Sequence, residues 1–355
     1  MNLLQKLDML MRRAGIEKIS FKNQFVAIKM HLGEPGNIAY LRPNYAKTCA
    51  DLIKSLGGKP FLTDSNTLYV GRRKDALEHL EAAYENGFNP FCTGCHVIIA
   101  DGLKGSDEAL VPVKGAELVK QAKIGRAIAD ADVIFSLTHF KGHELTGFGG
   151  VIKNIGMGSG SRAGKMEMHC DGKPSVSEDK CIGCGRCARN CAQHAISFSG
   201  GKAAVKEDKC VGCGRCISAC PFDAISENNY SSNENLCKKT AEYAKAVLDG
   251  KPSFHVSIVV DVAPFCDCHA ENDASVIADI GFFASFDPVA LDQACAEAVM
   301  AAPAVCNTYL SEKIKENGVD GDNFHAMHPS THWQTMLEHC ERLGVGTRKY
   351  ELIEV

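Results

Sequence analysis

Short apolar stretches rich in β-branched residues alternate along this chain with segments of helical apolar spacing. The alternation predicts strands at residues 25–30, 60–63, 97–100, 133–138 and 255–262. It predicts helices at residues 3–11, 43–56, 72–86, 115–129, 241–248 and 288–300. Strands and helices in this order favour an α/β fold with a mostly parallel sheet and helices on both faces.

Polar loops follow four of the predicted strands. They lie at residues 31–37, 64–67, 139–143 and 263–269 and contain His, Asp, Glu, Lys or Cys. Functional side chains in such folds collect at the carboxyl ends of the strands, so these loops predict a site there. The competing explanation is that surface loops are polar for solvation alone.

A duplicated cysteine pattern interrupts the alternation in the middle of the chain. The pattern Cys-x-x-Cys-x-x-Cys-x-x-x-Cys occurs twice, and its cysteines are Cys181, Cys184, Cys187 and Cys191, then Cys210, Cys213, Cys216 and Cys220. Eight thiolates at this spacing are typical of two cubane iron–sulfur clusters. Zinc sites and disulfides are the alternatives, but neither needs the duplicated spacing.

Residues 171–228 resemble a bacterial-type ferredoxin domain with two 4Fe–4S clusters. In such domains the fourth cysteine of each run binds the cluster of the other run. The resemblance therefore implies two crossed ligand sets, which are Cys181, Cys184, Cys187 and Cys220 for one cluster and Cys210, Cys213, Cys216 and Cys191 for the other. It also implies a small α+β insert in an α/β body made of residues 1–170 and 229–355.

Composition indicates the class of protein, its partners and its cellular compartment. The 355 residues are 45% apolar and 23% charged, as in an ordinary globular protein. The net charge of −4 predicts no nucleic-acid partner and no anionic membrane, and no apolar stretch is long enough to span a bilayer. Eighteen cysteines without a signal peptide favour the reducing cytoplasm, and cubane clusters favour an anaerobic niche.

The stretch 147–161 is rich in glycine but matches neither nucleotide-binding fingerprint. Its backbone amides, around Gly149, Gly150, Gly156 and Gly158, are suited to cradle an anion, with Lys153 as a point charge. The alternative is a close-packed turn in which glycine only relieves steric conflict.

Ten cysteines lie outside the duplicated pattern. Cys92 and Cys95 form one close pair, and Cys266 and Cys268 form another. Together the two pairs would make a soft tetrahedral site for zinc or a further iron–sulfur centre. Redox dithiols and plain buried thiols are the alternatives.

His139 and His143 flank Lys141 in the loop that leads toward Lys153. This grouping makes both histidines candidates for proton transfer or metal binding, and it makes Lys153 a candidate to hold an anionic group. The C-terminal histidines, at 325, 328 and 332, are more typical of structural residues.

The body also resembles a known family. The segments 33–37, 63–69, 139–143, 149–158 and 266–268 are similar to those of domain-of-unknown-function family 362, whose members are described as uncharacterised iron–sulfur centre proteins. The resemblance covers nearly the whole chain around the insert. It implies iron–sulfur clusters and no settled reaction.

Two hypotheses of function follow. The first is a redox enzyme whose clusters relay electrons to a small-molecule site in the body, with His139, His143 and Lys153 as candidate catalytic residues. The second is a non-catalytic electron carrier, or an accessory protein of metal or cluster maturation, that works with a redox partner protein. The large multi-loop body favours the enzyme, and the lack of a cofactor fingerprint favours the second hypothesis.

Overall fold

The computed structural model describes all residues except 70, 171–172, 228–231 and 318–320. Its centre is a six-stranded sheet in the order β14-β13-β6-β1-β2-β3. The strands are β1 (Phe25–Lys29), β2 (Lys59–Asp64), β3 (Val97–Ile99), β6 (Val133–His139), β13 (Ser253–Val259) and β14 (Gly281–Ser285). Neighbouring strands from β13 to β3 are parallel, whereas β14 pairs antiparallel with β13. The α/β fold with a mostly parallel sheet is therefore confirmed.

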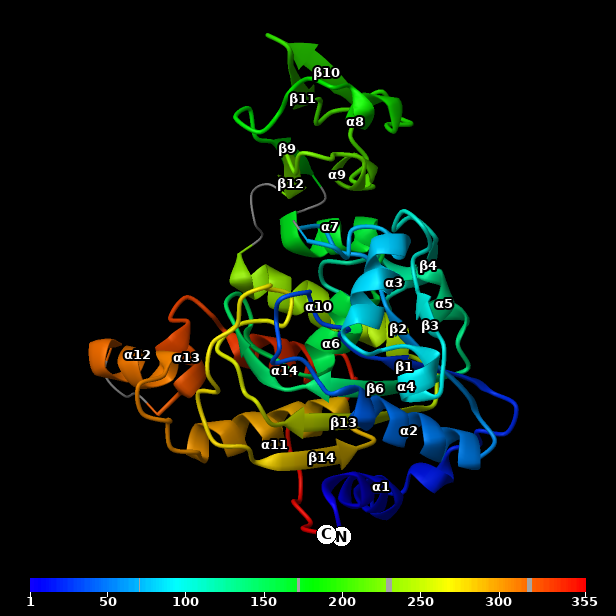
Figure 1. The fold of residues 1–355 in the computed structure, drawn as a ribbon, viewed down its shortest axis with the longest axis vertical. Helices are drawn as coiled ribbons and strands as arrows, with labels where there is room; N and C mark the ends of the chain where they lie inside the picture. The colour runs from blue at the N-terminus through cyan, green and yellow to red at the C-terminus, as the bar shows by residue number, and fades with distance from the viewer. Residues whose placement is uncertain (70, 171–172, 228–231, 318–320) are drawn as a thin grey trace.

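Helices cover both faces of the sheet (Figure 1). Each face of the sheet packs on its helices through a separate apolar core. One face carries α1 (Leu3–Arg13), α2 (Pro43–Ser55) and α3 (Ala76–Glu85), and the other carries α6 (Val151–Ser159), α10 (Asn233–Leu248), α11 (Pro288–Ala301) and α14 (Trp333–Arg342). Alternate residues of β1 serve the two cores, because Val26 and Ile28 lie in the first and Ala27 in the second.

The strand register brings the polar loops together. Lys29, the last residue of β1, lies opposite Thr63 in β2 and Ser136 in β6. In the next pair, Ile258 of β13 lies opposite His139 of β6. The loops that follow these strands therefore meet at one edge of the sheet, as the sequence predicts.

Two predicted elements are wrong. Residues 115–129, expected as a helix, contain a turn, β5 (Gln121–Gly125) and the short α5 (Arg126–Asp130), and β5 pairs with β4 (Glu108–Pro112). The glycine-rich stretch, expected as a loop, forms β8 (Gly147–Gly149), which pairs with β7 (Lys141–His143), and then α6. Glycine is a poor helix former, but a Cβ at Gly156 would stand 2.2 Å from the carbonyl oxygen of Thr240, so close packing against α10 requires it.

The remaining elements of the body are short or peripheral. They are η1 (Ile16–Lys18), α4 (Pro90–Thr93), α7 (Arg162–Cys170), α12 (Tyr309–Asn317) and α13 (Asn323–Met327). Among the described helices, none has the length and apolar character needed to cross a bilayer.

Residues 173–227 form a small α+β unit that stands off one end of the molecule, opposite the two termini (Figure 1). It contains β9 (Pro174–Val176), α8 (Arg186–Arg189), β10 (Ile196–Ser199), β11 (Lys202–Val205), α9 (Arg215–Ser218) and β12 (Ile225–Glu227). β9 pairs with β12 and β10 with β11, both antiparallel. The expected domain junctions at 171 and 228 lie outside the described residues.

Candidate functional site

Buried ion pairs mark the ends of the central strands. Lys29 at the end of β1 lies 3.0 Å from the Asp64 carboxylate at the end of β2. The same ammonium donates to the side-chain oxygen of Asn154 on α6 at 2.9 Å. Burial lowers the pKa of Lys29, and the Asp64 carboxylate opposes this shift.

A second buried network follows β6. His139 donates from Nδ1 to the Asp267 carboxylate at 2.9 Å, and its Nε2 lies 2.9 Å from the carbonyl oxygen of Val260. The Lys141 ammonium lies 3.2 Å from the other Asp267 oxygen. Both ring nitrogens of His139 therefore face acceptors of the chain itself. Proton transfer by His139, expected from the sequence, would require one of these two contacts to break.

Cys266, Lys153 and His143 form the chemically distinctive part of this edge. The Lys153 ammonium lies 3.8 Å from the Cys266 sulfur. His143 accepts at Nδ1 from the amides of Leu145 and Thr146, at 3.1 and 3.3 Å, which leaves Nε2 as its N–H donor. Hydrogen bonding to Cys268 lowers the pKa of the Cys266 thiol, burial opposes this, and Lys153 and His143 lower the pKa further.

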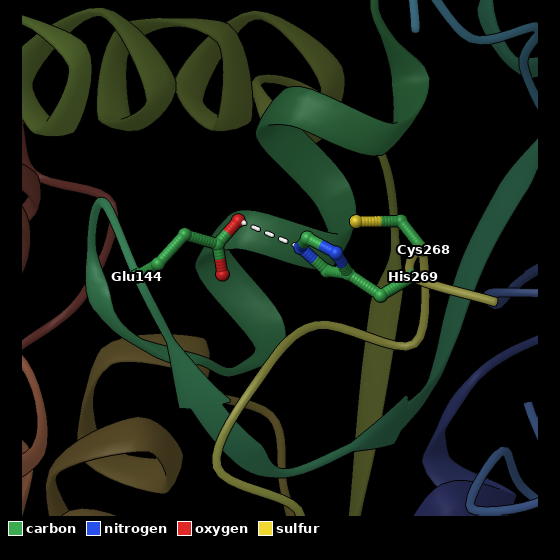
Figure 2. Close-up of side chains that lie close together, drawn as sticks. All are labelled: Glu144, Cys268 and His269. Atoms are coloured by element: carbon green, nitrogen blue, oxygen red, sulfur yellow. Dashed lines mark hydrogen bonds and ion pairs between the residues drawn. The ribbon is translucent and has the colours of Figure 1, made fainter. Parts of the chain in front are cut away.

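A third group lies beside this one. Glu144, Cys268 and His269 place one oxygen, one sulfur and one nitrogen within 4.8 Å of one another. Figure 2 shows the Glu144 carboxylate and the Cys268 sulfur on either side of the His269 ring. His269 Nε2 and Glu144 Oε1 are 3.3 Å apart, and this contact, though opposed by burial, raises the pKa of His269 to about 9.

Glu144, Cys268 and His269 line a cavity of about 530 Å³. Its lining side chains include Tyr69, His143, Glu144, Lys153, Lys165, His169, Cys268 and His269. A smaller pocket of about 60 Å³, lined by Lys29, Asp64, Arg73 and Cys266 among others, shares Tyr69, Lys153, Met157 and Lys165 with it. A space of this size, rich in convergent polar groups, is suited to a small ligand.

Two residues of this edge carried no signal in the sequence. Arg73 is fully buried and donates to Glu34 at 2.7 Å, and Asn154 joins the Lys29 network from α6. Arg73 lies in an ordinary helical pattern, and Asn154 lies in a stretch that the sequence predicts as a loop. The ion pair with Glu34 holds Arg73 at this edge, and the packing of α6 against the strand ends brings Asn154 there.

The glycine-rich stretch does not offer the anion cradle expected from the sequence. At the start of α6 the amides of Val151 and Ile152 donate to the carboxylate of Asp292, at 2.6 and 2.9 Å. A Cβ at Gly150 would stand 2.3 Å from an Asp292 oxygen, and one at Gly158 would stand 2.3 Å from the Lys29 ammonium. The alternative interpretation, close packing, accounts for these glycines. Gly149 of β8 likewise lies against the side chain of Lys141 in β7.

The structure does not bring the two outer cysteine pairs together. Cys92 and Cys95 precede β3 and therefore lie at the amino edge of the sheet, whereas Cys266 and Cys268 follow β13 at the carboxyl edge. Cys92 is exposed, and Cys95 packs in the apolar core with α2. Parallel strands hold the two pairs a full strand length apart, which the linear sequence could not reveal.

The eight cysteines of the insert surround two separate pockets. One pocket is lined by Cys181, Cys184, Cys187 and Cys220. The other is lined by Cys191, Cys210, Cys213 and Cys216. Each pocket thus takes three thiols from one run and the fourth from the other run. This is the donor set that a cubane cluster requires.

α7 lies between these pockets and the cavity of the body. Lys165 and His169 on α7 line the cavity, while Met166 on the same helix belongs to the apolar cluster that contains Cys181, Cys187 and Cys220. Leu68, which lines the cavity, belongs to the same apolar cluster. The insert is also tied to the body by an ion pair between Asp223 and Lys74.

Comparison with known proteins places the chain in a family. The sequence profile described as Domain of unknown function (DUF362) matches residues 26–297. The chain belongs to this family. The matched range includes all four polar loops of the carboxyl edge and the insert, so both candidate sites lie within the part that defines a DUF362 protein.

Two solved structures resemble this DUF362 chain. One is the lactate racemase apoprotein from Thermoanaerobacterium thermosaccharolyticum, with 12% identity and a TM-score of 0.43 over 79% of this chain and 52% of that one. The other, from Thermotoga maritima, has 13% identity and a TM-score of 0.40 over 82% and 57%. The chain spans little more than half the length of either. No protein of curated function matches its sequence.

Proposed function

We propose that this protein is an iron–sulfur redox enzyme. Two 4Fe–4S clusters in the insert would serve a small-molecule site at the carboxyl edge of the sheet. The observation that carries the proposal is the division of eight cysteines between two pockets of four thiols each. Bound clusters would supply single electrons of low potential.

The residues of the body suit a small anionic substrate. Lys153 and Lys165 line the large cavity, and Lys29, Arg73 and Lys141 line the adjoining pocket. Lys29, Arg73 and Lys141 are paired with carboxylates, whereas the Lys153 ammonium faces the Cys266 sulfur. Lys153 would bind the negative group of the substrate, and His143, with its N–H on Nε2, would hold a proton at the cavity wall.

The position of α7 supports communication between the two parts. Met166 of α7 belongs to the apolar cluster of the insert, and Lys165 and His169 of the same helix line the cavity. One helix thus joins the core of the insert to the wall of the cavity. A freely diffusing carrier would not need a cavity of about 530 Å³ beside its clusters.

The experiment that tests the clusters is an anaerobic count of iron and acid-labile sulfide. The intact protein should hold about eight of each. Cys184→Ser should remove one cluster, and with it half of the iron and half of the reduced cluster signal in electron paramagnetic resonance. Cys306→Ser, an exposed cysteine of the body, is the control and should change neither. Zinc without sulfide would overturn the assignment.

A second function, electron carriage to a partner protein, is favoured by one observation. Ile182 and Val211, each next to a cluster cysteine, expose more than half of their surface, at 63% and 62%. Exposed apolar residues beside a redox centre are suited to transient docking.

Reoxidation of the dithionite-reduced protein distinguishes the two functions. For the enzyme, some small anionic oxidant should reoxidise the clusters, and Lys153→Met should abolish this while His96→Gln, an exposed residue, should not. For the carrier, only protein acceptors should react, and Lys153→Met should leave the rate unchanged.

A further inference from the structure

The group of Glu144, Cys268 and His269 has the chemistry of a metal site separate from the cysteine pockets. Its three donors are of the types that bind zinc and similar divalent metals: carboxylate oxygen, imidazole nitrogen and thiolate sulfur. Their atoms lie within 4.8 Å of one another. Ligands of one tetrahedral zinc lie roughly 3.5 Å apart, so small side-chain rotations would bring all three to one ion.

The surroundings of these donors support this interpretation. Glu144 Oε2 is buried without a hydrogen-bond partner, although a carboxylate oxygen in that position needs one. The His269 ring presents Nε2 to Glu144, while its Nδ1 lies 3.5 Å from the carboxylate of Glu271. A carboxylate on the outer nitrogen is the usual partner of a metal-binding histidine, because it fixes the ring and its tautomer.

The site has an open side. All three donors line the cavity of about 530 Å³, so a fourth position would face that space. Three protein ligands with one open position are typical of catalytic zinc, and four protein ligands are typical of structural zinc. Other charged groups of the cavity wall are Glu34, Glu271, Lys153 and Lys165, two of each sign. The Glu144 carboxylate would attract a cation, and Cys268 would release its thiol proton on binding the metal.

We propose that Glu144, Cys268 and His269 bind one divalent transition metal of the zinc type, with its open coordination position directed into the cavity. The site replaces the four-cysteine arrangement expected from the sequence, because it takes only Cys268 from that set. The inference does not depend on the clusters. Metal binding here can be measured whether or not the proposed redox function holds.

The test uses the full chain with its insert intact, prepared anaerobically and titrated with zinc alone. Zinc affinity is measured by competition with a chromophoric chelator, and iron content is measured in the same samples. X-ray absorption at the zinc edge then counts sulfur and lighter ligands without interference from iron. We expect one zinc per chain bound by one sulfur and otherwise nitrogen and oxygen.

Single substitutions assign the ligands. Cys268→Ser should remove the sulfur, and Glu144→Gln and His269→Gln should each weaken binding more than 100-fold, beyond the roughly 10–100-fold loss typical of outer partners. Glu271→Gln should lower zinc affinity by only that smaller factor and still bind one zinc per chain. A variant that keeps this stoichiometry is folded, so its lower affinity reports a weakened site. Cys306→Ser and His96→Gln, both exposed, are matched controls and should bind normally.

Two results would overturn the proposal. Zinc with four sulfur ligands and a matching loss of iron would place the ion in a cysteine pocket of the insert. Zinc that binds equally to the Glu144, Cys268 and His269 variants would be adventitious. A failed iron count with normal zinc binding would instead overturn the redox function and leave this site standing.

Discussion

At the scale of single residues, the carboxyl edge of the sheet is a set of compensated buried charges. Lys29 pairs with Asp64, Arg73 with Glu34, and the Asp267 carboxylate serves both His139 and Lys141. Buried ions cost several kcal/mol each unless they are paired and hydrogen-bonded. The pairs therefore fix the side chains around the cavity. Removal of one partner would leave the other as an unpaired buried charge.

Asp267→Asn tests this dependence. The substitution keeps the shape of the side chain but removes the charge that pairs with the buried Lys141 ammonium and accepts from His139, so we expect a loss of about 3–5 kcal/mol in the free energy of unfolding. Urea denaturation followed by circular dichroism measures it. Asp130→Asn, an exposed residue of α5, is the control. An unchanged free energy would show that the network does not contribute to stability.

Candidate residues were predicted from the sequence to different extents. Cys191 and Cys220 each line the pocket formed by the other cysteine run, which is the arrangement that the ferredoxin resemblance implies. Glu144 and Arg73 carried no local signal. Their roles come from neighbours 125 and 39 residues away in the sequence, His269 and Glu34.

At the scale of elements, α6 is the helix that assembles the site. Its N-terminal amides are capped by Asp292 from α11, and it carries Lys153 and Asn154 to the strand ends. Burial raises the pKa of Asp292 to about 7 from an ordinary 3.8, despite the two amides that it accepts.

Asp292 gives a pH-dependent prediction. Between about pH 4 and 7 the folded protein keeps a proton on Asp292 that the unfolded chain has released, so this residue makes the free energy of unfolding fall as pH rises. Asp292→Asn should flatten that slope and retain one acceptor. Asp292→Ala should remove both acceptor oxygens and lower the free energy of unfolding by about 1–3 kcal/mol. Thermal unfolding across this pH range measures both effects, and equal slopes in the parent and the Asn variant would contradict the assignment.

The segment 115–129 shows why an element prediction failed. Its apolar residues fit a helical period, yet the Glu242 carboxylate on α10 accepts the amides of Glu117 and Val119, both at 2.6 Å. Those contacts hold a turn, and Ala122 and Ile124 then face the core from β5. A partner more than 120 residues away outweighs local periodicity.

At the scale of the whole molecule, the insert depends on its cysteines far more than the body does. Its apolar cluster is small, and three of the buried members are Cys181, Cys187 and Cys220. A unit of this size buries too little apolar surface to be stable alone, so bound clusters would supply folding free energy.

Removal of the proposed clusters with an iron chelator under anaerobic conditions tests the independence of the two parts. Hydrogen exchange should increase strongly in β10 and β11 of the insert and change little in β1 and β6 of the body. Mass spectrometry of peptic fragments resolves these segments. Exchange that increases equally throughout would show that insert and body form one cooperative unit.

The sequence by itself determined the α/β class, the positions of the main strands along the chain, the polar loops at their carboxyl ends and the duplicated cysteine pattern of the insert. All of these depend on spacing over a few residues, which periodicity and motifs record directly. Only the tertiary structure decided which loops face one cavity, that the outer cysteine pairs lie at opposite edges, and that Glu144 meets Cys268 and His269. Those relations depend on strand order and helix packing, which join residues more than a hundred positions apart.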